Sequence, residues 1–392
     1  MKNKKIKLGI ENLILCPPTS LKNKKLGLLC NPASLDNNFN HTAQIIGQNF
    51  PGQLKALFSP QHGFYAQKQD NMIESKHEKQ SKLKIPIYSL YNKKRIPTKK
   101  MFSLIDVLLI DIQDVGTRVY TFIYTISFCL EVAAKLNKKV VILDRPNPIG
   151  GTQIEGNILS KKFKSFVGRF PIPMRHGMTI GEISQFFNKE FNLGCSLTII
   201  PMTGWKRKMY WNDTKLSWIS PSPNLPTYES CLVYPGQVIF EGTNISEGRG
   251  TCLPFEQFGA PFLDTKKIKD NTQEKIKGAV LRTVRFEPVS GKYAKTMCKG
   301  FQIHVTSKKK YKPYFSSLVL LQAIIKYHKK NFKFKQPPYE YEFTKMPIDL
   351  ILGSKALRKE ITNLNDINIL ENRWNKDTRK FKNICKNYYL YE

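Results

Sequence analysis

The sequence predicts an α/β fold, with a doubly wound parallel sheet in the N-terminal part and a smaller α+β domain after it. Two observations support this prediction. Short runs of apolar and β-branched residues alternate with helical patterns over about the first 200 residues. Most of these runs are apolar almost without interruption, as is typical of parallel strands that are buried on both faces.

The pattern places each element in order. We expect strands at residues 25–33, 54–60, 85–90, 106–112, 139–145 and 196–202, and helices at 41–49, 121–137 and 179–192. The last of these helices begins with a capping box, in which Glu182 stands three residues after Thr179. Ligands of such sheets bind beyond the carboxyl ends of the strands. Polar loops follow three of the strands there: "SPQHGF", "DIQDVGTRVY" and "DRPNPIGG". None of them matches a dinucleotide fingerprint or a P-loop, so no nucleotide is predicted.

The pattern changes after "SPSPNLPTYES" at 220–230, which is rich in proline and serine. Beyond it we expect strands near 231–240, 282–289 and 300–306, a helix near 315–330, and a basic, aromatic tail. A chain of 392 residues is too long for one ordinary core. The sequence therefore predicts two domains, residues 1–228 and residues 229–392.

The formal net charge of +33 raises the possibility of a nucleic acid or a membrane surface as partner. The lysines, however, fall in tails, turns and helix surfaces such as "YNKKRIPTKK", and residues 101–134 and 216–265 contain none. The sequence has no zinc knuckle, RNP motif or alternation of basic and aromatic residues. We therefore predict no nucleic-acid or membrane partner, and a basic nucleic-acid-associated protein stays as an alternative from a different class.

The cysteines and the N-terminal segment bear on the compartment. The eight cysteines form no C-x-x-C pair and mostly fall in apolar runs, which indicates buried free thiols and no metal site. "MKNKKIKLGIENLILC" begins like a signal peptide, but Glu11 interrupts its apolar stretch and no small-x-small cleavage site follows. We predict a cytoplasmic protein and leave its oligomeric state open.

The loop "EGTNISEGRGT" at 241–251 is the clearest candidate for a ligand site. Glycines flank Glu241 and Glu247, and Arg249 follows. Glycine lets a backbone approach a ligand closely, and carboxylates beside an arginine suit a polar small molecule. In the other loops Asp114, Arg118 and His176 have a structural interpretation as well, as turn caps, ion pairs or core residues.

Six blocks of the sequence carry a resemblance to a known family. They occur in order from about residue 25 to 265: "SPQHGF", "DVLLIDIQDVGTRVYTFIYT", "VILDRPNPIGG", "PIPMRHGMTIGE", "SPSPNLPT" and "VYPGQVIFEGTNISEGRGTCLPFEQFGAP". Together they resemble the exo-β-N-acetylmuramidase (NamZ-like) family of glycoside hydrolases. The resemblance implies a Rossmann-like N-terminal domain, a smaller C-terminal domain and an active site between them. It also implies removal of N-acetylmuramic acid (MurNAc) from the non-reducing end of peptidoglycan fragments, a small-molecule substrate, without a metal or organic cofactor.

Two departures from the family pattern affect these expectations. The family block usually reads "SPEHG", with a glutamate thought to be catalytic, whereas this sequence has Gln61. Glycoside hydrolysis normally uses two carboxyl groups, and a glutamine cannot shuttle a proton. The alternative to an active enzyme is therefore a catalytically silent relative that binds muramyl sugars. Family members are also commonly exported, and the lack of a convincing signal peptide favours recycling of imported fragments.

Site residues are expected from the matching blocks. If the enzyme is active, the acid comes from Glu241 or Glu247, then from Asp114, then from Glu74, while Gln61 orients the sugar or a water. An arginine should meet the lactyl carboxylate of muramic acid, and Arg118, Arg175 and Arg249 are the candidates. The full set of predicted substrate-binding residues is His62, Arg118, Tyr120, Arg145, Asn147, Arg175, His176, Asn224, Asn244 and Arg249.

Overall fold

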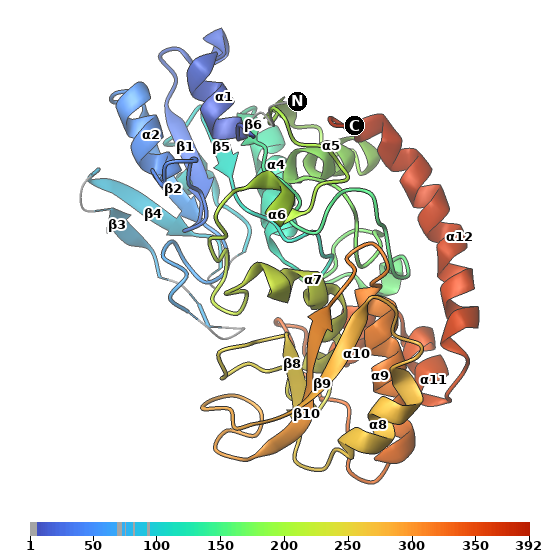
Figure 1. Ribbon diagram of the computed structural model, residues 1–392. Coiled ribbons are helices and arrows are strands. Elements are labelled where there is room, and N and C mark those ends of the chain that lie inside the picture. Colours follow the sequence, from blue (N-terminus) through green and yellow to red (C-terminus); the bar gives the residue numbers. More distant parts are fainter. Residues whose placement is uncertain (1–5, 69–72, 75, 81–82, 92–94) are drawn as a thin grey trace.

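The computed structural model describes residues 6–68, 73–74, 76–80, 83–91 and 95–392 (Figure 1). The larger sheet of this described part contains β1 Leu26–Cys30, β2 Leu54–Ser59, β3 Glu78–Gln80, β4 Ile85–Ser89, β5 Val107–Asp111, β6 Lys139–Leu143 and β7 Ser196–Ile200. Their order is β3-β4-β2-β1-β5-β6-β7, with all neighbours parallel except β3 and β4. The predicted parallel sheet is confirmed, and its parallel strands have the order of a Rossmann-type sheet. The short antiparallel β3 was not predicted.

Helices cover both faces of this sheet (Figure 1). Helices α1 Gly9–Leu15 and α2 Thr42–Asn49 share one apolar core with side chains such as Leu28 of β1. Helices α4 Phe122–Lys135 and α5 Ile180–Glu190 share the other with the next residue, Leu29. Because successive strand residues point to opposite faces, the central strands β1 and β5 are buried on both sides, which explains their uninterrupted apolar runs. The shorter helices of this part are α3 Lys99–Phe102 and α6 Trp211–Thr214.

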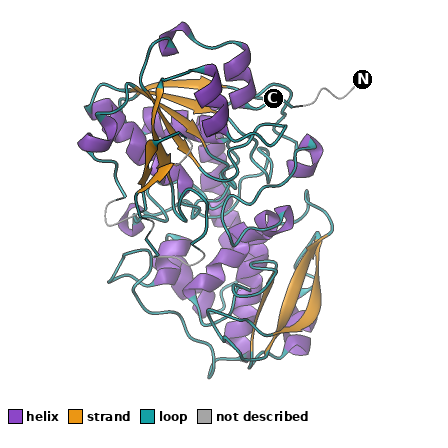
Figure 2. Cartoon of the chain, turned by 90° about the vertical axis from the view of Figure 1, so that its left-hand side faces the viewer, coloured by secondary structure: helices purple, strands orange, loops and turns teal. Residues whose placement is uncertain are grey.

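The C-terminal part is built around a small antiparallel sheet (Figure 2). Its described strands are β8 Gln257–Ala260, β9 Ala279–Phe286 and β10 Cys298–Val305, in the order β8-β10-β9. Its helices are α7 Tyr228–Gln237, α8 Thr265–Thr272, α9 Pro313–Tyr327, α10 Pro347–Leu352, α11 Lys355–Thr362 and α12 Ile367–Cys385. The predicted α+β class is confirmed, with β9, β10 and α9 at or near the expected positions.

The predicted strand at 231–240 is wrong, because this segment forms α7 and the 3-10 helix η3, Val238–Gly242. The hydroxyl of Thr227 caps α7 by accepting a hydrogen bond from the amide of Ser230 at 3.1 Å. All residues of α7 except Glu229 are buried. A helix that is buried on all sides has no polar face, so its short apolar sequence cannot be told from a buried strand by periodicity.

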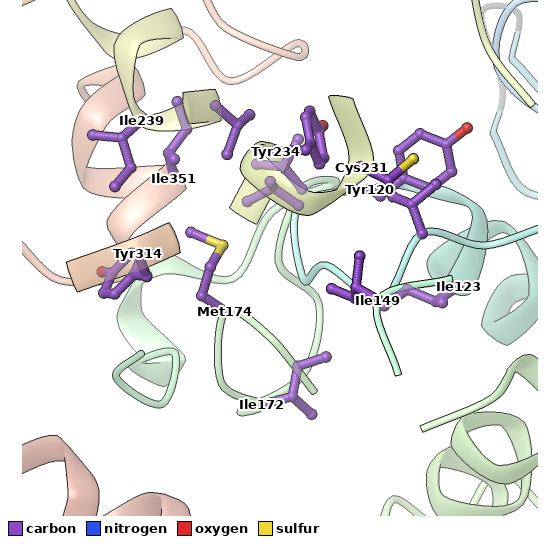
Figure 3. Close-up of a cluster of buried hydrophobic side chains, with 14 of the residues drawn as sticks. Tyr120, Ile123, Ile149, Ile172, Met174, Cys231, Tyr234, Ile239, Tyr314 and Ile351 are labelled. Carbon is purple, nitrogen blue, oxygen red and sulfur yellow. The ribbon is translucent and has the colours of Figure 1, made fainter. Parts of the chain in front are cut away.

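One hydrophobic core joins the two parts of the chain (Figure 3). Tyr120 and Met174 from the N-terminal part belong to the same buried cluster as Tyr234, Tyr314 and Ile351. Tyr120 and Tyr234 meet edge to face with 6.1 Å between their ring centroids. The shared core fixes the position of the C-terminal helices against the loops at the carboxyl end of the larger sheet.

The C-terminal segment returns to the N-terminal part. Helix α12 runs from beside α9 and α11 along the molecule toward α5 (Figure 1). After it, the hydroxyl of Tyr391 donates to Asp144 at 2.5 Å and accepts from the amide of Met202 at 2.9 Å. Because Asp144 and Met202 follow β6 and β7, the tail occupies the sheet edge beyond these two strands.

Candidate active site

A pocket lies where the loops after β2 and β5 face the C-terminal part of the chain. Residues from both parts line it: Gln61, His62, Val119, Tyr120, Thr121, Phe122, Val167, Ser222, Asn224, Leu225, Tyr234, Glu241, Arg249, Phe255, Tyr339 and Glu340. Its walls combine aromatic rings with a few carboxyl, amide and guanidinium groups. Such a mixture of apolar walls and few polar groups is typical of small-molecule sites.

Gln61 stands at the N-terminal wall of the pocket, two residues beyond the end of β2. Its side-chain oxygen accepts a hydrogen bond from Thr121 at 2.7 Å, and its Nε2 donates to Glu340 at 3.3 Å. Gln61 is only 6% exposed. The glutamine is therefore held between a hydroxyl of the N-terminal part and a carboxyl of the C-terminal part.

Glu340 lies in a tight turn before α10. Tyr339 and Glu342 exchange two backbone hydrogen bonds, and both residues between them, Glu340 and Tyr341, have positive φ angles of 47° and 64°. The Glu340 carboxyl accepts hydrogen bonds from Tyr91 at 2.7 Å and from Gln61. Burial, reinforced by the charge of Glu241, raises the pKa of Glu340.

Glu241 belongs to an ionic cluster in the glycine-rich loop. Arg249 lies 2.6 Å from Glu241 and 3.4 Å from Glu247, and Lys292 binds Glu247 at 2.8 Å. Tyr339 donates a further hydrogen bond to Glu241 at 2.7 Å. Burial alone would raise the pKa of Glu247, but Lys292 and Arg249 together hold it below its ordinary value. Glu241 and Arg249 line the pocket, whereas Glu247 is not among the described residues that do.

The glycines of this loop make the cluster possible. Gly248 and Gly250 have φ angles of 81° and 77°, and a Cβ on Gly248 would lie 2.5 Å from the carbonyl oxygen of Gln257. Only glycine adopts such a backbone at so close an approach without strain. The loop therefore turns Arg249 back toward both glutamates.

His62 has a neutral side chain at the pocket wall. Burial, with a smaller effect of Arg249, lowers the pKa of His62 to about 4. Its Nδ1 lies 2.6 Å from the carbonyl oxygen of Lys68. Because a carbonyl can only accept, Nδ1 carries the proton and Nε2 is left as an acceptor for a hydroxyl group.

The chain matches known proteins over its whole length. Family models described as the N-terminal and C-terminal parts of exo-beta-N-acetylmuramidase NamZ match residues 26–229 and 232–391. The chain belongs to the exo-β-N-acetylmuramidase NamZ family. It is 39% identical to the peptidoglycan beta-N-acetylmuramidase NamZ of Bacillus subtilis, covering 100% of this chain and 92% of that relative.

Solved structures of Bacteroides fragilis proteins from the DUF1343 family are similar to this NamZ family member. Two crystal structures share 33% and 30% of its sequence, with TM-scores of 0.88 and 0.76, and each alignment covers 99% of both chains. The predicted family and fold are thus confirmed. These comparisons do not support the alternative of a catalytically silent relative.

Six of the predicted site residues of this NamZ family member line the pocket: Gln61, His62, Tyr120, Asn224, Glu241 and Arg249. Besides Glu247, two further candidates for the acid do not line it. Asp114 accepts a hydrogen bond from the amide of Gly116 at 2.7 Å and lies 3.4 Å from the fully buried His176. Glu74, the last candidate for the acid, is also outside the set of described lining residues.

Two of the three arginines expected at the lactyl group bind the protein away from the pocket. Arg118 is fully buried and donates to the carbonyl oxygens of Asn157, Ile172, Ile351 and Leu352 at 2.7–3.0 Å. Arg175 donates to Gln153 and to the carbonyl of Ile149. These contacts join segments of the fold, and only the Nε of each guanidinium is buried without a partner among the described residues.

Three further predicted residues also have structural contacts. Arg145 pairs with Asp111, which directly precedes the loop after β5. Asn147 donates to the carbonyl of Met178 at 2.9 Å. Asn244 donates to the carbonyl of Asn331 at 2.8 Å and accepts from the amide of Lys333 at 2.9 Å. Arg145 lines a separate crevice beside β1 and β5.

Glu340, Tyr339 and Lys292 were missed by sequence reasoning. Their segments match no motif, and Tyr339 and Glu340 fall in the basic, aromatic tail. One signal was available, since "PPYEYE" places two glutamates between aromatic residues in a stretch otherwise rich in lysine.

Two further observations concern metals and membranes. Among the residues whose positions are described, no group of three or more histidine, cysteine, aspartate or glutamate side chains could hold a metal ion. Nor does the described part of the chain include a helix with the length and apolar character needed to span a bilayer.

Proposed function

We propose that this member of the NamZ family is an active exo-β-N-acetylmuramidase, which releases MurNAc from the non-reducing end of peptidoglycan fragments. The observation that carries this proposal is the presence of two carboxyl groups, those of Glu241 and Glu340, in the pocket beside Gln61. Two carboxyl groups are what glycoside hydrolysis normally requires. The pocket therefore still contains two carboxyl groups, although residue 61 carries an amide.

The two carboxyl groups have different surroundings, which suits two different roles. Glu241 forms an ion pair with Arg249, so it acts as a carboxylate that stabilises positive charge at the sugar ring. Glu340 accepts hydrogen bonds from the neutral donors Tyr91 and Gln61 instead. In glycosidases, two carboxyl groups whose surroundings push their pKa values apart act as the protonated acid and the charged partner.

Polar side chains at the pocket wall are suited to bind the sugar. In this proposal Nε2 of His62 accepts a hydrogen bond from a sugar hydroxyl, and Asn224, in the segment before α7, also binds the sugar. Tyr120 and Tyr234 supply the apolar surface on which a pyranose ring packs.

Arg95 is a further candidate for the lactyl carboxylate. Its guanidinium stacks 3.5 Å above the ring centroid of Tyr341, in the same turn as Glu340. Its Nε is buried without a hydrogen-bond partner in the part of the chain that the structure describes. Arg118 donates four hydrogen bonds and Arg175 two to protein groups, and the Nε of each also lacks a partner among the described residues. Arg249 lines the pocket and Arg95 stacks on the turn of Glu340, so Arg95 or Arg249 is the better partner for a substrate carboxylate.

The test is incubation of the purified protein with MurNAc-GlcNAc and, separately, with GlcNAc-GlcNAc. We expect free MurNAc from the first disaccharide and much slower cleavage of the second. In Arg95→Gln the preference for MurNAc should fall by about 10–100-fold, since a charged hydrogen bond contributes about 1.5–3 kcal/mol. Arg285→Gln, on β9 away from the pocket, is the control. Binding of MurNAc-GlcNAc without any release of sugar would contradict the proposal and favour the silent relative.

We also propose the division of the chain into a Rossmann-like catalytic domain, residues 1–228, and a C-terminal domain, residues 229–392, that completes the cleft. The two family models meet close to this boundary. Expression of residues 1–228 alone tests the role of the C-terminal domain: because one core joins the two parts, we expect an inactive fragment that is less stable than the whole chain, and an active fragment would contradict the proposal that residues 229–392 complete the cleft.

Finally, we propose a cytoplasmic location and a role in the recycling of imported wall fragments, without a nucleic-acid or membrane partner. The apolar residues Ile10 and Leu13 of α1 are buried in the core of the N-terminal part, which supports retention of this segment in the working enzyme. Cell fractionation tests the location, and a shortened form of the protein outside the membrane would contradict it.

A further inference from the structure

We propose that Glu340 is the proton donor of the reaction, in place of the acid that Gln61 cannot supply. This inference rests on the proposed glycosidase function and names the residue that performs one of its steps. Glu340 lines the pocket, is 4% exposed and touches Gln61 directly. The Glu340 carboxyl thus contacts residue 61, the position at which the family pattern has its glutamate.

The backbone at Glu340 gives independent support. Glu340 and Tyr341 occupy the two central positions of the turn, and both have left-handed φ angles. Turns of this kind strongly prefer asparagine, aspartate and glycine, because a left-handed conformation costs other residues of order 1 kcal/mol each. Both side chains are used: Tyr341 supports Arg95, and Glu340 enters the pocket. The strained turn is therefore explained by what its two side chains do.

Burial favours a Glu340 carboxyl that keeps its proton, although the hydrogen bonds that Tyr91 and Gln61 donate to it, and the charge of Arg95, each lower its pKa. Glu241 and Glu247 each bind a cationic side chain at less than 3 Å, as expected of carboxylates. The hydrogen-bond partners of Glu340 are a phenol and an amide. Burial and the charge of Glu241 act in the same direction, because both disfavour a second negative charge in the pocket.

The proposed step is balanced as follows. The bond from C1 of MurNAc to the bridging oxygen breaks, and its electron pair stays on that oxygen, which takes the proton of Glu340. A water oxygen then bonds to C1 and gives up a proton, which returns to Glu340 directly or through solvent. The Glu241 carboxylate stabilises the positive charge that develops at C1.

The charged and titratable groups around Glu340 come from several elements, and all of them enter its pH dependence. They are Tyr91 after β4, Arg95, Tyr234 on α7, Glu241 on η3, and Tyr339 in the turn itself. Because the donor must be protonated, kcat/KM should fall as the pH rises through the raised pKa of Glu340.

The decisive experiment compares Glu340→Gln with wild type on two substrates. One is MurNAc-GlcNAc, whose leaving group needs a proton, and the other is a dinitrophenyl β-MurNAc glycoside, whose leaving group does not. We expect kcat to fall by about 10²–10⁴-fold on the disaccharide, and by less than about tenfold on the aryl glycoside. The loss of rate at high pH should also disappear in Glu340→Gln. Glu342→Gln, at the end of the same turn, should stay within about twofold of wild type, since Glu342 contacts only its own loop among the described residues.

The outcomes separate the two levels of the proposal. Equal losses on both substrates, or a Glu340→Gln variant as active as wild type, would overturn the assignment of Glu340 while leaving the glycosidase function intact. A correctly folded wild type that releases no MurNAc would overturn both. Thermal melting of each variant distinguishes a loss of chemistry from a loss of fold.

Discussion

Arg249 is the residue on which the charge balance of the pocket depends. It holds Glu241 at 2.6 Å and Glu247 at 3.4 Å, in a region where all three side chains are largely buried. Burial lowers the pKa of the Arg249 guanidinium, but Glu241 and Glu247 together raise it above its ordinary value. Arg249 is therefore charged throughout the working pH range. The main contacts of Arg249 are therefore its ion pairs with the two carboxylates, and a contact with the substrate would come in addition to them.

Replacement of Arg249 should therefore destabilise the protein. Arg249→Met leaves two buried carboxylates without their shared partner, and we expect a loss of about 3–5 kcal/mol in the free energy of unfolding. Arg373→Met is the matched control, because it breaks an ion pair with Glu360 in which the arginine is 59% exposed. An exposed pair of this kind contributes less than about 1 kcal/mol. Urea unfolding measures both, and equal losses would contradict the role given to Arg249.

Gln61 decides how many carboxyl groups share the proton. In Gln61→Glu a second carboxyl would stand at the 3.3 Å contact with Glu340. Two such groups cannot both ionise easily, so the pair should keep its proton to higher pH. We expect the fall of kcat/KM at high pH to move upward in pH, with the rate at the optimum changed by less than about tenfold.

The pH–rate profile of Gln61→Glu beside wild type measures this shift. A shift toward lower pH would contradict the contact between residues 61 and 340. Strong rescue of an inert wild type would show that Glu340 does not supply the proton.

At the scale of single elements, α5 depends on its first turn. The hydroxyl of Thr179 accepts from the amide of Glu182 at 3.2 Å and donates to Asp144 at 2.8 Å. Asp144 also accepts from the hydroxyl of Tyr391 in the C-terminal tail. Burial raises the pKa of Asp144 to about 7, whereas the hydrogen bonds that neutral groups such as Tyr391 and Thr179 donate to it lower this pKa. These donors therefore stabilise the charged form of Asp144. The cap thus connects α5, the end of β6 and the tail.

Thr179→Ala should reduce the free energy of unfolding by about 1–2 kcal/mol, since it removes the cap and one hydrogen bond to Asp144. Thr179→Ser keeps the hydroxyl and should stay within about 0.5 kcal/mol of wild type. Thermal or urea unfolding of the two variants checks the prediction. A loss of the same size in both would mean that the methyl group, and not the hydroxyl, stabilises this turn.

For the whole molecule, the net charge of +33 is the dominant surface property. The pocket itself carries a different balance, since Glu241, Glu340 and Arg249 line it. Lys99 and Lys100 on α3 belong to the lysine-rich stretch 92–100 and are exposed, whereas Lys93 and Lys94 of that stretch lie outside the described residues. Exposed charges are screened over about 8 Å at physiological ionic strength.

The lysine-rich surface should therefore have little effect on catalysis. We expect the double variant Lys99→Gln/Lys100→Gln to hydrolyse MurNAc-GlcNAc within about twofold of wild type at 150 mM salt. Rates at low and at physiological salt measure the effect. A large loss in the variant would mean that this surface takes part in substrate binding.

The sequence by itself determined the local features of this protein. Continuous apolar runs predicted the six parallel strands, the spacing of Thr179 and Glu182 predicted a capping box, and the glycines of 241–251 indicated a tight loop around charged residues. All of these depend on interactions between residues that are close in the chain or on burial of a whole segment. Helix α7 shows the limit of such rules. It contains Pro235 in its interior, and its burial on all sides leaves no helical periodicity in its sequence.

Only the tertiary structure decided which polar residues meet. Gln61 and Glu340 are 279 residues apart in the chain, and Tyr91 and Glu340 are 249 apart. No periodicity or spacing connects such residues, because their contact depends on how α7, α9 and α10 pack against the N-terminal core. The same packing turned Arg118 inward to four carbonyl groups and brought Arg249 between two glutamates. A buried charge must find its partners in three dimensions, so sequence could name the polar residues but not assign each of them to the pocket or to the core.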